Sequence, residues 1–443
     1  MIDSFQKFGI NLKDKRSIRF FDAGLLKEID ESFVKEVRDY WQKYYKKSID
    51  PSIHIAFMNL TGKKDPRMIP GREMWREIIP YFNDQGMDVG YRDKNIYDIL
   101  IKTPNSVESV IKRVRGNYYD SENNPLNRKS VHDILINTDS EYIIKPSDSN
   151  NGVGIEKLTV QNKSLVLSNK QVTLEGLEDM YESNFVVQKV IQQHPIMARP
   201  HPSSVNTLRM VTLRWKGEIK YLLTFARFGA NGSVKDNAGA GGVCLGLNED
   251  GDFFDIAVDE HCNTYSHHPT SNFKFSDMER IPNFGRFKEF VVNLHKSILH
   301  HDFISWDIAV SNDAQPIFIE ANFAGATWLY QMASQQPLFG DLTEEILVHI
   351  SQEFQKGVKR DIQIRSLKAR EKKLKRNNRK LKKENQSLKD KLTSSDNEIK
   401  NMKEKYENME EKYENTEKKY ENMINSRSWK ITAPLRKISN TLK

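Results

Sequence analysis

The chain has 443 residues, of which 38% are hydrophobic and 29% are charged, so it is long enough for two or more domains with a sizeable core. Its net charge of +8 is uneven: residues 361–443 hold 24 Lys and Arg against 13 Asp and Glu, whereas residues 1–360 hold 44 against 47. The basic character therefore belongs to the C-terminal region, and the remaining chain has no charge pattern that supports a nucleic-acid-binding function.

The cysteine content and the hydropathy of the sequence indicate in which cellular compartment the protein lies. Cys244 and Cys262 are too few for a disulfide framework and form no CxxC pair, which fits a reducing environment. The first ten residues lack the apolar run of a signal peptide, and no stretch approaches the roughly 18 apolar residues of a membrane-spanning helix. We therefore expect a cytoplasmic protein.

The N-terminal part of the chain is predicted to be helical. Residues 1–60 include KEIDESFVKEVRDYWQKYYKK, with apolar residues at helical spacing, and Asp50-Pro51 is expected to end that helix. Residues 61–125 mix short elements with loops. A further helix is expected to begin at NRKSVHDIL, capped by Asn127 or Ser130.

From Ser140 onward the pattern predicts mostly strands. The expected strands are EYIIK, GIEKLTV, SLVLS, FVVQKVI, TLRMVTLRW, EIKYLLTFARFG and GGVCLGL, with a hairpin at Lys216-Gly217. Two amphipathic helices follow them, RFKEFVVNLHKSILHH and TEEILVHISQEFQKGV. Strands joined by hairpins and mixed with helices favour an α+β fold over a doubly wound sheet.

A segment rich in Ser, Asn and Gly follows the strand that ends at Lys145. Its sequence, PSDSNNGVG, offers many backbone N–H groups that can fold over phosphates, and the lysine can neutralise phosphate oxygens. The segment joins two strands rather than a strand and a helix, so it is not a Walker A loop. The alternative is an ordinary hairpin turn beside a surface lysine.

Two arginines lie within otherwise apolar strands. Arg209 is in TLRMVTLRW and Arg227 is in EIKYLLTFARFG, where an unpaired guanidinium would be costly. An anion facing these positions explains both, and buried ion pairs to Asp or Glu are the alternative. A second Gly-rich segment, KDNAGAGGV, follows, and its Asn237 is a candidate for a phosphate or metal shell.

The stretch ISWDIAVSNDAQPIFIEANF predicts two short strands around a turn at Asn312-Asp313. Asp307 lies in the first strand, and Glu320 and Asn322 lie two residues apart in the second, so on one face. A hairpin brings Asp307 opposite them. Two carboxylates and an amide oxygen are hard ligands that suit Mg²⁺ carrying a nucleotide phosphate. The alternative is an edge hairpin with solvent-facing acids.

The composition changes abruptly after Lys359. Leucines recur every seven residues from Leu367 to Leu388, a second row begins at Ile364, and the frame holds for about sixty residues, roughly 90 Å of helix. We predict a coiled coil over residues 361–425. Asn378 and Asn385 favour a parallel homodimer, whereas the tyrosines further along make the second half a weaker zipper. A charged single helix or a disordered tail is the alternative.

Residues 426–443, SRSWKITAPLRKISNTLK, alternate apolar and basic side chains. Such a basic amphipathic tail can lie on an anionic membrane surface, which would make the protein peripheral at the inner face of the cell membrane. A frayed end of the coiled coil is the alternative. The segment also resembles the end of many bacterial glycosyltransferases of cell-surface polysaccharide pathways.

Taken together, the motifs resemble the ATP-grasp superfamily. PSSVNTLR, DNAGAGGV, SWDIAV and IEANF are similar, more narrowly, to the sugar-transfer-associated ATP-grasp family found with bacterial surface-polysaccharide genes, over roughly residues 60–350. The resemblance implies an ATP-grasp fold whose two subdomains, residues 126–190 and 191–360, clamp ATP. Residues 61–125 would precede these two subdomains in the chain.

The resemblance also implies a role for each matching residue. Lys145, Arg209 and Arg227 are the expected catalytic residues, with the lysine on the nucleotide phosphates and the arginines facing the γ-phosphate or an anionic substrate. Mg²⁺ would be held by Asp307, Glu320 and Asn322. The other expected nucleotide-binding residues are Lys94, Ser147, Asn151, Gly152, Gly154, Gln188, Lys189, Val190 and Asn237. Of these, residues 188–190 form the adenine hinge, and Gln188 replaces the acid that many members use for the ribose.

The implied function is an ATP- and Mg²⁺-dependent ligase acting in bacterial surface-polysaccharide or capsule biosynthesis. It would activate a carboxylate as an acylphosphate for transfer to an amine or another nucleophile, with electrostatic stabilisation of the transferring phosphoryl group. The expected substrate is a small molecule or glycan precursor, and a glycosyltransferase is a candidate partner. The alternatives are a sugar or polyol kinase on the same fold, and a non-catalytic nucleotide-binding scaffold for glycosyltransferases.

Overall fold

The computed structural model describes residues 5–137, 141–148, 153–231 and 241–427. The chain divides into two compact units, residues 1–367 and residues 368–443. None of the helices in the described part of the chain combines the length and the apolar composition that a membrane span requires.

In the N-terminal region of the first unit, the described residues include the helices α2 (Lys15–Asp22), α3 (Glu31–Tyr45) and α4 (Ser52–Thr61). The Asp30 carboxylate caps α3 by accepting a hydrogen bond from the Phe33 N–H, and α3 ends at Lys46, which has a left-handed backbone. The helix therefore stops before Asp50-Pro51, where the sequence had predicted its end. The short helices that follow are α5 (Gly71–Glu73), η1 (Met74–Ile78), α6 (Ile79–Phe82), α7 (Asp88–Tyr91), η2 (Lys94–Ile96) and α8 (Tyr97–Leu100).

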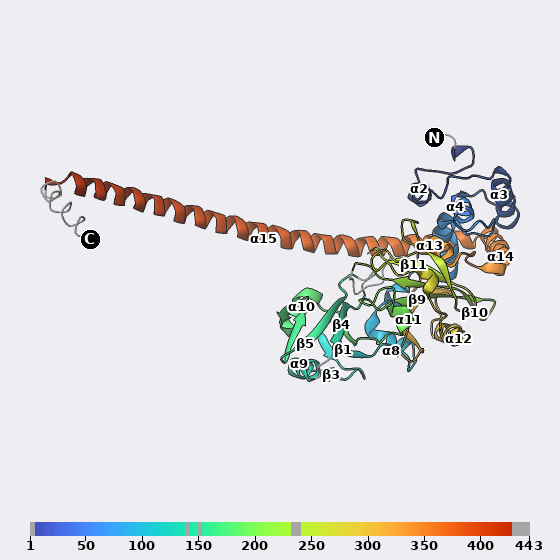
Figure 1. Ribbon diagram of the computed structural model, residues 1–443, viewed down its shortest axis with the longest axis horizontal. Helices are drawn as coiled ribbons and strands as arrows, with labels where there is room; N and C mark the ends of the chain where they lie inside the picture. The colour runs from blue at the N-terminus through green and yellow to red at the C-terminus, as the bar shows by residue number, and fades with distance from the viewer. Residues whose placement is uncertain (1–4, 138–140, 149–152, 232–240, 428–443) are drawn as a thin grey trace. The chain divides into compact units, whose positions relative to one another are not determined.

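An antiparallel sheet of eight strands comes next, in the order β3-β2-β1-β8-β4-β5-β6-β7. Its strands are β1 (Ser109–Val114), β2 (Asn117–Tyr119), β3 (Pro125–Leu126), β4 (Glu141–Pro146), β5 (Glu156–Gln161), β6 (Ser164–Leu167), β7 (Lys170–Val172) and β8 (Phe185–Lys189). The sheet therefore begins within the region 61–125 that the sequence placed ahead of the small subdomain. Helices α9 (Arg128–Ile136), capped by the Asn127 side chain, and α10 (Leu174–Tyr181) share one hydrophobic core with this sheet (Figure 1).

A second antiparallel sheet has seven strands in the order β13-β12-β11-β10-β9-β14-β15. Its strands are β9 (Thr207–Trp215), β10 (Glu218–Phe228), β11 (Val243–Leu247), β12 (Phe253–Val258), β13 (Thr264–Tyr265), β14 (Phe303–Val310) and β15 (Pro316–Asn322). The helices around it are α11 (Pro195–Ala198), η4 (Phe275–Asp277), α12 (Phe284–His295), α13 (Thr327–Ser334), η5 (Gly340–Leu342) and α14 (Thr343–Gln355). The predicted hairpins at Lys216-Gly217 and Asn312-Asp313 are both present.

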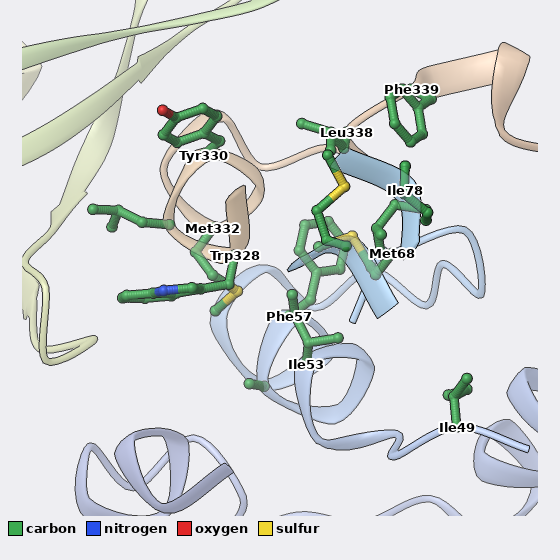
Figure 2. Packing of buried hydrophobic residues seen from close by; sticks show 14 of the residues in the cluster. Ile49, Ile53, Phe57, Met68, Ile78, Trp328, Tyr330, Met332, Leu338 and Phe339 are labelled. Atoms are coloured by element: carbon green, nitrogen blue, oxygen red, sulfur yellow. The ribbon is translucent and has the colours of Figure 1, made fainter. Parts of the chain in front are cut away.

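The two faces of the second sheet bury different cores because successive strand residues point to opposite sides. Leu208 and Met210 share a core with the apolar side of α12. Val211 and Leu213 belong to another core, which includes α13, α14 and the N-terminal helices. Figure 2 shows Trp328 and Met332 between α13 and the helix that carries Ile53 and Phe57. The face toward α13 also carries Arg209 and Asp307.

The second unit consists mainly of a single long helix. Helix α15 (Val358–Asn425) has 68 residues and begins within the first unit (Figure 1). This agrees with the predicted long C-terminal helix. The predicted tail lies almost entirely in residues 428–443, outside the described part of the chain.

Candidate active site

Three oxygen-bearing side chains predicted to bind metal lie on one face of the seven-stranded sheet. Asp307 on β14 is paired in register with Glu320 on β15, and Asn322 follows two residues later on the same face. The pairing shifts register between Asp307 and Ile308, because Phe318 is opposite Ile308 and Ile319 is an extra residue. Without this bulge Glu320 would be opposite Trp306, on the face toward α12. The bulge therefore places the two carboxylates side by side.

Two arginines reach the same face from β9 and β10 and bind Asp307. Arg209 donates from Nε and Nη2 to the two carboxylate oxygens at 2.5 and 2.8 Å, and Arg227 donates from Nη1 to Oδ2 at 3.0 Å. Burial alone would raise the pKa of Asp307, but the charges of Arg209 and Arg227 outweigh it and lower the pKa. Asp307 is therefore held as an anion. Arg209 and Arg227 form buried ion pairs with it, which is the alternative that the sequence had left open.

Tyr330 on α13 holds Arg209 from the other side. Its hydroxyl accepts a hydrogen bond from Arg209 Nη1 at 3.1 Å and lies 3.0 Å from the Ser305 hydroxyl. Figure 2 shows Tyr330 on the side of α13 opposite Trp328 and Met332. A Cβ atom on Gly325 would be 1.8 Å from the Tyr330 hydroxyl, so only glycine fits there. Sequence reasoning missed Tyr330, because nothing local distinguishes it from an ordinary core aromatic residue.

Two lysines approach from η2 and β4. Lys94 Nζ is 3.2 Å from Glu320 Oε1, and the Lys94 N–H donates to the carbonyl oxygen of Ser147. Lys145 is buried, and burial together with the Lys94 charge lowers its pKa to about 8, while the negative charges of Glu320 and Asp307 oppose this shift. The structure thus brings the predicted lysines, arginines and carboxylates into a single charged cluster.

The segment after Lys145 is described in part. Ser147 is fully buried, and its hydroxyl has no hydrogen-bond partner among the described atoms. Gly154 has a φ of +74°, and a Cβ there would lie 2.9 Å from the Pro146 ring, so the position requires glycine. Asn151, Gly152 and Asn237, which the sequence also assigned to nucleotide binding, lie outside the described residues.

The predicted hinge lies at the end of β8. Gln188 is buried on the same side of the sheet as Lys145, since its pairing partner Ile143 is two residues from that lysine. Its side-chain amide donates to the Ser109 hydroxyl at 3.2 Å. Lys189 is exposed and forms an ion pair with Glu108, and Val190 follows the strand. The assignment of these residues to adenine remains a prediction.

A second tyrosine that the sequence did not single out also lies near the carboxylates. Tyr97 on α8 is buried, and its hydroxyl lies against the backbone of Ala321 on β15. Burial and the negative charge of Glu320 raise its pKa well above the usual value. The hydroxyl therefore stays protonated, next to the acidic pair.

The chemistry of this cluster fits Mg²⁺ together with a phosphate-bearing ligand. Among the described residues, no group of three or more His, Cys, Asp or Glu could hold a metal, so a site here rests on two carboxylates and an amide. Such a small number of protein ligands is typical of Mg²⁺ sites in which waters and substrate phosphates complete the coordination shell. The Asn322 amide donates to Asp307 Oδ2 at 3.4 Å, which leaves its oxygen available to a cation. Four basic groups against two acids favour an anion beside the metal.

Comparison with known proteins gives a family match over most of this region. A family model described as sugar-transfer associated ATP-grasp matches residues 74–346. No curated protein sequence matches the chain. The matched range contains every candidate site residue from Lys94 to Asn322.

Several solved structures are distantly similar. The D-alanine–D-alanine ligase from Bacillus anthracis is 13% identical, with 62% of this chain and 71% of that chain covered and a TM-score of 0.33. The corresponding ligase from Coxiella burnetii is 12% identical, with 62% of each chain covered and a TM-score of 0.35. An L-amino acid ligase from Bacillus licheniformis is 11% identical, with 60% of this chain and 49% of that chain covered and a TM-score of 0.32. The chain thus spans less than two thirds of the latter two structures.

Proposed function

Since the chain belongs to the sugar-transfer associated ATP-grasp family, we propose that it is an ATP- and Mg²⁺-dependent ligase that activates a carboxylate for attack by an amine or another nucleophile. The family and ATP-grasp fold predicted from the motifs are confirmed by this membership. ATP and Mg²⁺ are the cofactors that go with it.

One observation carries the proposal. Asp307 and Glu320 lie side by side on the seven-stranded sheet, and Lys94, which contacts Glu320, is joined through its backbone to the segment that follows Lys145 on the other sheet. Burying positively and negatively charged groups costs free energy unless each group has a partner of opposite charge. A cluster with more basic than acidic groups is best explained by an anionic ligand that arrives with its own metal ion.

The residues of the chain would divide the work. Asp307, Glu320 and Asn322 would hold Mg²⁺, which supplies positive charge beside the transferring phosphoryl group when it is bound. Lys145, positively charged below pH of about 8, would bind phosphate oxygens. Arg209 is kept in place by Tyr330, so its guanidinium is already oriented before a ligand binds. Arg227 shares Asp307 with it and is the second arginine available to an anionic substrate.

The biological context is also part of the proposal. The family description, sugar-transfer associated, and the glycosyltransferase-like segment SRSWKITAPLR both support a role in bacterial cell-surface polysaccharide or capsule biosynthesis. A sugar acid or amino acid of the surface polymer is then the expected substrate. We further propose homodimer formation through α15, a glycosyltransferase partner, and contact of the C-terminal tail with the inner face of the cell membrane.

A screen for substrate-dependent ADP release tests the proposal. Purified protein with MgATP is offered amino acids, sugar acids and nucleotide sugars, each with and without an amine acceptor. We expect ADP release with one carboxylate class, and hydroxylamine should then trap the activated acyl group as a hydroxamate. ADP release on a sugar or polyol with no hydroxamate would contradict the ligase and identify a kinase. The Lys145→Met variant is the negative control.

A further inference from the structure

An apolar stripe along α15 lies open to solvent in the single chain. Every residue from 371 to 423 is exposed, and the large side chains of the heptad rows are among the most exposed hydrophobic groups described. Leu388 is 63% exposed, Leu392 64% and Tyr413 70%. A stripe at the a and d positions of a heptad is an interaction surface for another helix.

The charged residues beside the stripe indicate which helix that is. With Leu388 at d and Asn385 at a, the g position of each heptad faces the e position five residues further along the partner in a parallel, in-register pair. From residue 384 onward, five successive g–e contacts between two copies of this chain would join opposite charges. The pairs are Glu384–Lys389, Lys391–Asp396, Glu398–Lys403, Lys405–Glu410 and Lys412–Glu417.

The same charges oppose a slip of the two helices by one heptad. If one copy slips by a heptad, one row of the dimer places Glu384 opposite Asp396, Lys391 opposite Lys403 and Glu398 opposite Glu410. The other row places Lys391 opposite Lys389, Glu398 opposite Asp396 and Lys405 opposite Lys403. Within residues 384–423 these six like-charged contacts outnumber the attractive ones, which are Lys405–Glu417, Lys412–Glu410 and Lys419–Glu417. Like charges at these positions disfavour a pairing and opposite charges favour it. The pattern is therefore most complementary to itself in register, where each of the five g–e pairs joins opposite charges on both sides of the dimer.

The pattern also shows where pairing should begin. Residues 368–383 contain ten Lys and Arg and a single acid, Glu371, and that acid occupies an a position. Arg370 and Lys375 would meet as like charges across a dimer. The basic segment 368–383 therefore opposes pairing, whereas residues 384–423, about 60 Å of helix, favour it.

We propose that residues 384–423 of two copies of this chain form a parallel, in-register coiled coil in which the basic segment 368–383 stays outside the pairing. This narrows the homodimer of the proposed function to a defined interface and orientation. Tyr406, Tyr413 and Tyr420 at a positions weaken the apolar seam, so the charged rows select the partner. In such a parallel pair, the chains that lead to the coiled coil from residues 1–367 of both copies join it at the same end.

Cysteine cross-linking tests orientation and register. Both native cysteines are buried, so a new exposed cysteine is the reactive thiol in the full-length protein. Leu388→Cys places one thiol against its counterpart only if the helices are parallel and in register. We expect a disulfide-linked species of twice 51.6 kDa under mild oxidation. Ser387→Cys, at the adjacent outward-facing c position, should give none. Absence of the Leu388→Cys dimer, or equal cross-linking of both variants, would overturn the proposal.

A charge swap tests the pairing code. Glu384→Lys with Glu398→Lys turns four cross-chain attractions of a dimer into repulsions, and we expect the dimer dissociation constant, from sedimentation equilibrium, to rise at least about tenfold. Adding Lys389→Glu and Lys403→Glu should restore it to within about threefold. Glu404→Lys with Glu411→Lys, at outward f positions, is the matched control. A quadruple variant that dimerises no better than the double variant would contradict the pairing. Neither experiment depends on nucleotide, so their failure would leave the proposed ligase activity untouched.

Discussion

Replacing Lys145 by methionine should stabilise the ligand-free protein while weakening nucleotide binding. The pKa of Lys145 falls from its ordinary value of 10.5 to about 8 because the ammonium is buried beside Lys94. A shift of that size corresponds to ~3 kcal/mol against the charged form in the folded protein at neutral pH. Methionine has a similar length and no charge, so Lys145→Met should raise the free energy of unfolding by about 1–3 kcal/mol.

The pH dependence of the free energy of unfolding gives a second, independent test of the lowered pKa of Lys145. The folded pKa lies below the unfolded one, so between pH 8 and 10.5 the unfolded chain binds more protons than the folded protein. Wild-type stability should therefore rise with pH across this window relative to the variant, and the advantage of Lys145→Met should shrink toward zero.

Urea denaturation at several pH values, without nucleotide, measures both effects. Lys157→Met, on the neighbouring strand β5 with its lysine largely exposed, is the matched control and should change the free energy of unfolding by less than ~0.5 kcal/mol. Nucleotide titration of Lys145→Met should show an affinity loss of about tenfold or more, as expected for a lost charged hydrogen bond. Destabilisation by Lys145→Met, or unchanged nucleotide affinity, would refute the reasoning.

Three further variants test the cluster and the core by urea denaturation. Asp307→Asn should lower the free energy of unfolding by about 3 kcal/mol, because two buried guanidinium groups lose their charged partner, and a loss below ~1 kcal/mol would contradict the ion-pair network. Tyr330→Phe should cost about 1–2 kcal/mol through the hydrogen bonds lost by Arg209 and Ser305, and an unchanged midpoint would show that the hydroxyl positions nothing. Burial lowers the pKa of His295 and His301 from 6.5 to about 3, so between pH 3 and 6.5 the unfolded chain binds more protons than the folded protein, and the free energy of unfolding should fall as the pH drops below 6.5. His295→Gln should make this pH dependence of the free energy of unfolding less steep, and an unaltered pH dependence would argue against the lowered pKa.

Most elements that carry the candidate site followed from sequence periodicity. The apolar runs around Arg209, Arg227, Asp307 and Lys145 are long and strand-like, and the turns between them contain Gly or Asn-Asp. Polar residues in such runs need a partner or a ligand, so their positions alone indicate a candidate site. The sequence could not choose between an ion pair and a bound anion, and the structure contains the ion pair.

Other features depend on contacts that a single sequence does not reveal. The bulge at Ile319 sets which face Glu320 occupies, and no residue in PIFIEAN marks it. Tyr330 and Tyr97 read as core aromatics, because their hydroxyl contacts come from strands and helices far away in sequence. The helix boundary at Tyr45 was also missed, since Lys46 adopts a left-handed conformation that its side chain does not predict.

We propose that Glu320, with Asp307 and Asn322, holds the Mg²⁺ of a bound nucleotide. The most direct measurement is calorimetric titration of a non-hydrolysable ATP analogue into wild type and Glu320→Gln, each with and without Mg²⁺. Wild type should bind at least about tenfold more tightly with Mg²⁺, and Glu320→Gln should lose that difference. Glu279→Gln, an exposed ion-pair partner of Arg199, should behave as wild type. Equal enhancement by Mg²⁺ in wild type and Glu320→Gln would contradict the assignment.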